Sequence, residues 1–228
     1  MMPDFLGMVS VVIPCYNLSE HVASAINTAL TQTYRKVEVI VVNDGSTDNS
    51  EEVIRQYESR ITLINQENQG LSKARNAGIR SSHGEFILPL DADDWISPDY
   101  LTKTVPLMRD QQIGIVSTDM QYFGLKQDLV RTTGFTLEDE MHANQIPVCS
   151  LIRREAYNQT PGYAEVECDD WNMWIDILKK GWHVGYVPEP LFHYQIRKGS
   201  LCDQHQGRGR QEAEEIRRQH PELNWGLR

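Results

Sequence analysis

The sequence predicts an α/β fold, in which a mostly parallel, twisted sheet carries helices on both faces. Short runs of β-branched and aliphatic residues, such as 9–14 and 37–42, recur through the amino-terminal part of the chain. Their continuous apolar character indicates strands that are buried on both faces. Segments with helical apolar spacing separate these runs, and turn-forming residues such as 43–46 mark the junctions. This alternation is typical of a parallel sheet, because right-handed crossovers place helices on both of its faces.

The expected elements alternate regularly as far as residue 90. Ser19 is the expected N-cap of the first helix, in which Val22, Ile26 and Ala29 share one face. Ligands of such sheets bind beyond the carboxyl ends of the strands, so the loops after each strand are the candidate site. The elements are strand 9–14, the helix that Ser19 begins, strand 37–42, a helix through Val53 and Tyr57, strand 61–64, helix 71–79 and strand 85–90.

The pattern changes after about residue 97. Ser97 and Pro98 predict a helix start, with serine as the cap and proline at the first position. Pro106 is expected to end or kink that helix. The remaining expected elements are a strand at 113–123, an irregular segment at 124–148, a helix at 169–180 that ends at Gly181, a short strand at 183–187 and a weak helix near 211–219.

Composition limits the classes of partner. The chain has 228 residues, a formal net charge of −10 and a pI of about 5.2, so we expect no nucleic-acid partner. The first residues lack a basic start and a long apolar run, and the apolar runs elsewhere are too short to span a bilayer. The four cysteines include no CxxC pair, which argues against zinc and a disulfide framework. We therefore expect a cytoplasmic protein without a transmembrane segment.

The strongest chemical motif is Asp91-Ala92-Asp93-Asp94, which directly follows a predicted strand. In an extended chain, alternate side chains point the same way, so Asp91 and Asp93 are expected to lie together. Clustered carboxylates need a cation or strong hydrogen-bond donors. Oxygen ligands suit Mg²⁺ or Mn²⁺, which in turn hold a diphosphate. The alternative is an acidic turn that caps the helix beginning near Ser97.

Two further motifs contain aspartates at the ends of predicted elements. Asp44 ends a strand and begins the segment Asp-Gly-Ser-Thr-Asp, which suits either a nucleotide contact or a turn followed by a helix cap. Asp169 and Asp170 begin a helix, where negative charge is favourable on structural grounds alone. The P-loop GxxxxGK[ST], the dinucleotide fingerprint GxGxxG and the nucleophile elbow GxSxG do not occur.

The order of these pieces resembles the inverting family 2 glycosyltransferases, which have the GT-A fold with a Rossmann-like sheet. The resemblance covers about residues 8–200, and it is specific because the motifs occur as an ordered set. It implies one domain over 1–200, with a nucleotide-sugar-binding half at about 1–96, an acceptor-binding half at 97–200 and a polar tail at 201–228 that is solvated or faces a partner. The matching segments are 9–17, 39–50, 68–78, 91–94, 169–171 and 185–200.

The resemblance also implies residue roles. The divalent ion would be Mn²⁺ or Mg²⁺, and it would stabilise the charge of the departing diphosphate. The acceptor hydroxyl would attack from the opposite face of the sugar and lose its proton to a carboxylate. The roles are nucleobase contacts for Pro14, Tyr16 and Asp44, nucleotide binding for Arg75, ribose or metal binding for Asp91, metal binding for Asp93 and general-base catalysis for Asp170.

The chain departs from the family pattern at four positions. Asp169 replaces a glutamate, and Asp176 stands where arginine is frequent on the acceptor helix. Gln195 and Arg197 stand where arginine and histidine are frequent, which alters one possible metal or phosphate contact. These departures affect the expected specificity for sugar and acceptor.

The expected activity is transfer of a sugar from a nucleoside-diphosphate donor, a UDP-sugar, to a hydroxyl of a glycan, a lipid-linked glycan or a protein. Acceptors of the second kind would place the protein peripherally at the inner face of the membrane. One alternative is a nucleotidyltransferase, but the loop 14–18 lacks the glycine- and arginine-rich character expected there. The other is a nucleotide-sugar-binding module of the same fold that has lost turnover.

Overall fold

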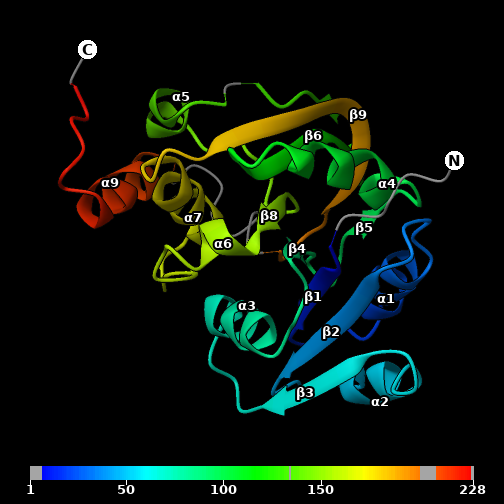
Figure 1. Cartoon of the computed structure of the whole chain (residues 1–228). Coiled ribbons are helices and arrows are strands. Elements are labelled where there is room, and N and C mark those ends of the chain that lie inside the picture. The colour runs from blue at the N-terminus through cyan, green and yellow to red at the C-terminus, as the bar shows by residue number, and fades with distance from the viewer. Residues whose placement is uncertain (1–6, 134, 201–208, 227–228) are drawn as a thin grey trace, which may run out of the picture.

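The structure is a computed structural model that describes residues 7–133, 135–200 and 209–226. Within these residues one sheet contains all the strands. Figure 1 shows β1, β2 and β3 side by side in one part of it, and β6 and β9 side by side in the other. The strands are β1 (Val9–Cys15), β2 (Val37–Asp44), β3 (Thr62–Gln66), β4 (Phe86–Pro89), β5 (Trp95–Ile96), β6 (Ile113–Gly124), β7 (Leu129–Val130), β8 (Leu151–Arg153) and β9 (His183–Ile196). Their order is β3-β2-β1-β4-β8-β6-β9-β5, and β7 pairs with β6.

Helices connect these strands and cover the sheet. Most of them are short, and the longest ones, α3, α7 and α9, surround the region where the candidate site lies. The helices are α1 (Val22–Leu30), α2 (Ser50–Arg55), α3 (Leu71–Arg80), α4 (Tyr100–Thr104), the 3₁₀ helix η1 (Val105–Arg109), α5 (Leu137–His142), α6 (Arg154–Tyr157), α7 (Asp169–Leu178) and α9 (Gly209–Gln219).

The prediction of an α/β fold is confirmed, and the first half of the sheet has the expected parallel pairing. Strands β2 and β4 flank β1 in parallel, and β3 continues the sheet beyond β2. The second half is mixed, because β8 runs antiparallel to both β4 and β6 while β6 and β9 are parallel. Parallel pairing thus holds for the first four strands in sequence and for β6 with β9, while the other pairs of the second half are antiparallel.

Alternate side chains of the buried strands form two cores, one on each face of the sheet. Val11 and Ile13 of β1 face α1, α2 and α4, whereas Val12 faces α3, α6 and α7. All three side chains are fully buried, as the continuous apolar run predicts. Figure 1 shows α1 and α2 on one side of the parallel strands and α3 on the other.

A close helix–sheet contact fixes α3, which leads from the candidate site. A Cβ atom added at Gly78 would lie 2.4 Å from Val12 Cγ1 and 3.0 Å from Val42 Cγ2. No larger residue fits at that distance unless the strands move. Gly78 therefore sets the distance between α3 and the strand ends that carry the site.

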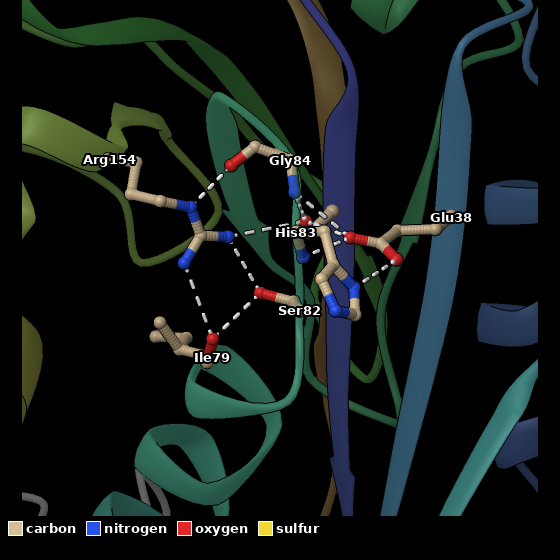
Figure 2. A network of polar contacts seen from close by, with 7 residues as sticks. Glu38, Ile79, Ser82, His83, Gly84 and Arg154 are labelled. Atoms are coloured by element: carbon tan, nitrogen blue, oxygen red, sulfur yellow. Dashed lines mark hydrogen bonds and ion pairs between the residues drawn. The ribbon is translucent and has the colours of Figure 1, made fainter.

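The amino ends of the strands, opposite the site, are held by a polar network (Figure 2). Arg154 donates to the Gly84 carbonyl and, at 2.7 Å, to Ser82 Oγ, while Ser10 Oγ donates to Glu38 at 2.6 Å. Burial alone would raise the pKa of Glu38, but hydrogen bonds from Ser10 and from the backbone at 83–84 lower it below its usual value. The network joins β1, β2 and the start of α6 at the edge of the sheet that carries no candidate chemistry.

Several local predictions are wrong. Neither Ser19 nor Ser97 caps a helix, because α1 begins after His21 and α4 begins after Asp99, and neither residue makes a side-chain cap bond. Pro106 coincides with the predicted irregularity, because α4 passes into the 3₁₀ helix η1 there. The caps failed because serine also suits the turns that precede these helices.

Two predicted elements in the second half are incomplete. The segment expected to be irregular contains β7 and also α5, which has a capping box formed by Thr136 and Asp139. The short strand expected at 183–187 extends to Ile196 as β9, beyond Pro188 and Pro190. The prolines are tolerated because register shifts interrupt the β6–β9 ladder around Asp119.

The carboxyl-terminal segment is not simply solvated. Helix α9 lies beside α7 (Figure 1), and its Ile216 is buried against Trp171 and Ile175. The expectation of a solvated tail is therefore wrong for the described part of it, 209–226, while 201–208 lie outside the described residues.

Candidate active site

A cavity of about 510 Å³ opens at the carboxyl ends of β1, β2 and β4. The sequence predicts that a ligand binds at this edge of the parallel sheet. Five of the predicted site residues lie on its walls: Pro14, Tyr16, Asp44, Asp91 and Asp93. The structure thus brings the loops after three strands together in one hollow, which we call the donor cavity.

Two loops of the donor cavity are joined by hydrogen bonds around Asn17. The Asn17 side chain accepts from Thr47 N at 2.7 Å, and its own backbone N donates to Ser46 Oγ at 3.1 Å. Asn17 has a φ of 52°, in the left-handed region that asparagine tolerates better than most residues. This contact fixes the loop that presents Tyr16, whose side chain is 46% exposed at the cavity.

Asp44 is buried, and its carboxylate orders a neighbouring loop. Its Oδ1 accepts from Gln66 Nε2 at 2.7 Å and from Gln69 N at 2.9 Å, and its Oδ2 accepts from Gly70 N at 2.9 Å. Gly70 has a φ of 90°, which a residue with a side chain adopts only with strain. Asp44 therefore shapes the wall of the donor cavity from which α3 begins.

The three carboxylates of the Asp91–Asp94 motif have different environments. Asp91 Oδ1 accepts from Arg75 at 2.6 Å, and Asp93 Oδ2 accepts from Arg197 Nε at 2.7 Å. Asp94 points into the protein, where Gln195 N donates to its Oδ1 at 2.8 Å. Burial, and then the charges of the other two carboxylates, raise the pKa of Asp94 well above its usual value.

The donor cavity suits a divalent cation that also binds phosphate. Asp91 and Asp93 supply carboxylate oxygens on one wall, and each uses one oxygen in an arginine pair. Within residues 7–133, 135–200 and 209–226, no group of three or more acidic, histidine or cysteine side chains could hold a metal alone. One or two carboxylates completed by phosphate and water are the usual Mg²⁺ arrangement, so the donor set fits such an ion.

Arg75 is not on the wall of the donor cavity but lines a second cavity beside it. Its guanidinium, which is buried, donates to Asp91 at 2.6 Å and to Asp169 Oδ1 at 2.5 Å, and Ser72 Oγ donates to Asp169 Oδ2 at 2.9 Å. It also lies 5.4 Å from the ring centre of Tyr163. Arg75 thus connects the metal-type motif to the start of α7, which sequence spacing alone does not indicate.

A second cavity, of about 650 Å³, adjoins the first. The two share Leu71, Asp91 and Tyr194 on their walls, and Asp170 lines only the second. Asp170 Oδ2 accepts from Asn144 Nδ2 at 3.2 Å, whereas the adjacent Asp169 is held by Arg75. Of the adjacent pair Asp169 and Asp170, only Asp169 has an ion pair with the described residues. We call this hollow the acceptor cavity.

The surroundings of Asp170 favour its protonated form more than water does. Burial and then the charge of Asp169 raise the pKa of Asp170 to about 6, against the opposing effect of Arg75. Behind it lies Glu140, which is fully buried and whose pKa is raised to about 8 by burial and by the charge of Asp170. Asp170 is thus a carboxylate that can exchange a proton near neutral pH.

The tryptophans that follow Asp170 have structural roles. Trp171 Nε1 donates to the Glu140 carbonyl at 2.6 Å, and Trp174 Nε1 donates to the Ile146 carbonyl at 2.9 Å. Both rings are buried, so they pack within the protein and are not exposed for stacking on a sugar. Asp176 is also buried and pairs with Lys179 at 2.7 Å, away from the acceptor cavity.

Sequence reasoning missed several residues of the acceptor cavity. Asn144 and Glu212 on its wall, and Glu140 buried behind it, come from segments that were expected to be irregular or solvated. The one available signal was Thr136 with Asp139, a capping box that would have predicted α5 and so the position of Glu140. Of the four cysteines, Cys15, Cys149 and Cys168 are free thiols, and Cys202 lies outside the described residues.

Comparisons with known proteins agree with this geometry. The family described as Glycosyl transferase family 2 matches residues 10–161. The chain is 42% identical over 216 residues to "Glycosyltransferase GlyA" of Streptococcus pneumoniae, covering 85% of this chain and 31% of that protein. It covers 31–64% of the first three curated relatives, so it spans a third to two thirds of their length.

Two solved structures have the same fold. TarS of S. aureus in complex with UDP-GlcNAc superposes with a TM-score of 0.74 at 18% identity, covering 85% of this chain and 60% of that one. The mannosyltransferase PcManGT of Pyrobaculum calidifontis, in complex with GDP-Man and Mn²⁺, superposes with a TM-score of 0.77 at 20% identity, covering 97% of this chain and 66% of that one. The fold is therefore GT-A.

No helix in the described part of the chain is long and apolar enough to cross a membrane. The family match covers most of the chain, and the motifs that carry the resemblance line one continuous hollow. This chain belongs to glycosyl transferase family 2.

Proposed function

We propose that this chain transfers a sugar from a nucleoside-diphosphate donor, a UDP-sugar, to a hydroxyl acceptor with inversion of the anomeric centre. The observation that carries the proposal is the junction of the two cavities. A carboxylate motif of metal type lines one cavity, Asp170 lines the other, and Asp91 borders both. A donor in the first cavity and an acceptor in the second would meet at that junction.

On the donor side, the chain binds and orients the nucleotide. Pro14, Tyr16 and the loop ordered by Asp44 border the base and ribose, while Asp91 and Asp93 hold Mn²⁺ or Mg²⁺ with the diphosphate. When bound, that ion stabilises the negative charge that grows on the leaving group. Nearby, Arg197 pairs with Asp93 at 2.7 Å and adds positive charge to the same wall. The nucleotide sugars and the Mn²⁺ in the two structural neighbours support this assignment.

On the acceptor side, Asp170 accepts the proton of the attacking hydroxyl. Asn144 orients its Oδ2, and Trp171 N donates to its Oδ1 at 2.8 Å, so the carboxylate has a fixed direction. A base whose pKa lies near the working pH combines ionisation with affinity for a proton. The two cavities adjoin at Leu71, Asp91 and Tyr194. Attack opposite the leaving group would give a β-linked product from an α-linked donor.

The acceptor is a glycan, a lipid-linked glycan or a protein, and a lipid-linked acceptor would place the chain peripherally at the inner face of the membrane in the cytoplasm. A second candidate is a nucleotide-sugar-binding module without turnover. The pairing of Asp93 with Arg197 favours it, because that contact occupies an oxygen that would otherwise bind metal.

A panel of nucleotide sugars with Mn²⁺ or Mg²⁺ tests the proposal. A donor that binds the folded state raises the melting temperature by mass action. Release of free nucleoside diphosphate from that donor separates an enzyme from a binding module. Binding without release would contradict the proposed activity, and absence of binding would contradict both candidates.

A further inference from the structure

The acceptor cavity has a wall from the far end of the chain. Gly209 and Glu212, in the first turn of α9, line it together with Cys168 and Asp170. A helix that closes such a cavity can contribute to recognition only if it is firmly placed. The packing of α9 therefore decides whether this wall is fixed.

Contacts hold α9 and the residues after it against α7. Ile216 is 1% exposed and packs on Trp171 and Ile175, and Leu223 and Trp225 extend the same cluster. Beyond the helix, Lys179 of the α7 carboxyl end pairs with Glu222 at 3.0 Å. The segment is thus attached at two places along α7, which also carries Asp170.

Helical geometry relates the buried anchor to the cavity. Glu212 and Ile216 are four residues apart, so their side chains lie on the same face of α9, one turn from each other. The anchor therefore directs Glu212 toward the α7 start. Glu215 and Glu214 of the same helix have partners, Glu167 N at 3.3 Å and Arg210 at 3.6 Å. The Glu212 carboxylate has no hydrogen bond or ion pair with the described residues 7–133, 135–200 and 209–226.

Carboxylates dominate the electrostatics of this wall. Burial, followed by the charges of Asp170, Glu212 and Glu167, raises the pKa of the Cys168 thiol. The guanidinium of Arg75 does not offset them fully, because it already pairs with Asp91 and Asp169. The wall of the acceptor cavity contains two cations, Arg75 and Arg131, against five carboxylates. Three of these carboxylates, Asp169, Asp170 and Glu212, belong to α7 and α9.

We propose that Glu212 determines acceptor specificity: its carboxylate accepts a hydrogen bond from a hydroxyl or ammonium group of an uncharged or amino-bearing sugar. An ionised carboxylate only accepts hydrogen bonds, so it binds such donor groups favourably and repels a phosphate or carboxylate at the same place. The inference rests on the proposed function, because it names the acceptor class of the same site. It also extends acceptor recognition beyond residue 200, where the sequence had placed its end.

The test compares matched acceptors with the donor found in the nucleotide-sugar panel. The probes are an uncharged aryl glycoside, the corresponding 2-amino glycoside and the corresponding sugar 6-phosphate, each assayed for kcat/KM with the full chain. We expect kcat/KM for the uncharged and the amino glycoside to exceed kcat/KM for the sugar phosphate by about tenfold or more, which corresponds to about 1.4 kcal/mol. Glu212→Lys should reverse that ratio. Glu212→Gln removes the negative charge, so it should remove any preference for the amino glycoside over the uncharged one.

The matched control is Glu214→Gln, on the same helix, where the partner is an exposed arginine at 3.6 Å. It should leave the ratio unchanged, and the melting temperature of each variant establishes that the protein is folded. A native preference for the phosphate, or an unchanged ratio in folded Glu212→Lys, overturns the inference. Release of nucleoside diphosphate without transfer to any of the glycosides also overturns it and leaves the proposed function standing. Absence of release from every donor contradicts the proposed function itself.

Discussion

The donor and acceptor cavities use the same side chain, aspartate, in opposite ways. In the donor cavity, Asp91 and Asp93 each accept from an arginine, at 2.6 and 2.7 Å. In the acceptor cavity, the bonds that the described residues make to Asp170 come from neutral groups, an amide side chain and a backbone N–H. Charge partners favour a fixed negative charge, whereas burial without them favours proton exchange. The difference supports the proposed ligand binding in one cavity and the proposed acid–base chemistry in the other.

The two cavities also differ in construction. The donor cavity is built from loops that directly follow β1, β2 and β4, together with the end of β9. The walls of the acceptor cavity come from segments spread between Leu71 and Glu212. Arg75 is the link between them, since it binds Asp91 of the first and Asp169 beside the second. Changes in the donor cavity, in the acceptor cavity and at Arg75 should therefore affect different measurements: donor turnover, sugar transfer and the free energy of unfolding.

Removal of the divalent ion should cause the largest loss of activity, and it should act through the donor cavity alone. We expect excess EDTA to abolish donor turnover, because the departing diphosphate loses its main source of positive charge. Restoration by Mn²⁺ or Mg²⁺, measured as nucleoside-diphosphate release, is the control. Full activity in EDTA would mean that Arg197, which lies 2.7 Å from Asp93, provides the positive charge without a metal.

Asp170→Asn should isolate the acceptor side. The change keeps the shape of the side chain and removes its proton affinity, so transfer should fall by about 10²–10⁴-fold. Donor binding, measured by calorimetry, should persist, because it depends on residues of the other cavity. Transfer at the native rate would place the base elsewhere and reduce Asp170 to a helix-start residue.

Arg75→Met should break the link between the cavities. It leaves Asp169 buried without its cation, and breaking such a pair typically costs about 3–5 kcal/mol. The free energy of unfolding, from denaturant titration, is the measurement. Arg80→Met, an exposed arginine on the same helix, should change it by less than about 0.5 kcal/mol. Equal effects of the two variants would show that the link contributes no stability.

The contrast explains which parts of the site the sequence predicts. Continuous apolar runs and the turns after them predict the first four strands in sequence, and so the position of Asp44 and Asp91 at one edge of the sheet. Those signals are local. The pairing of Arg75 with Asp169 joins residues 94 positions apart, and no local pattern encodes it.

The errors have the same physical origin. Helix α9 is polar along most of its length, and its position depends on Ile216 meeting Trp171 and Ile175 in three dimensions. Without those contacts its composition is typical of a solvated segment. The second half of the sheet, in which β8 runs antiparallel between β4 and β6, likewise depends on long-range pairing. Tertiary contacts override local preference at these places.

A smaller loss should follow from Asp44→Ala, which tests how the donor cavity is shaped. The carboxylate orders the loop at Gln69 and Gly70 through two backbone hydrogen bonds of 2.9 Å. We expect nucleoside-diphosphate binding to weaken by about 1–3 kcal/mol, the usual cost of losing such a charged, buried acceptor. Calorimetry measures the change, with Glu67→Ala, an exposed neighbour, as control. Unchanged binding would make Asp44 a turn residue alone.

The mildest perturbation, pH, distinguishes the two environments of aspartate without any substitution. Burial and the charge of Asp169 raise the pKa of Asp170 to about 6. As a base it must be ionised, so transfer should be near its plateau above about pH 7, reach half of it near pH 6 and fall to about a tenth at pH 5. The residual transfer of Asp170→Asn should not vary over that range, which assigns the titration to this residue. Donor binding at each pH, measured in parallel, separates proton loss at the base from any change in the donor cavity. A native rate that stays constant down to pH 5 would mean that Asp170 titrates like an exposed carboxyl, and the proposed difference between the two cavities would then be wrong.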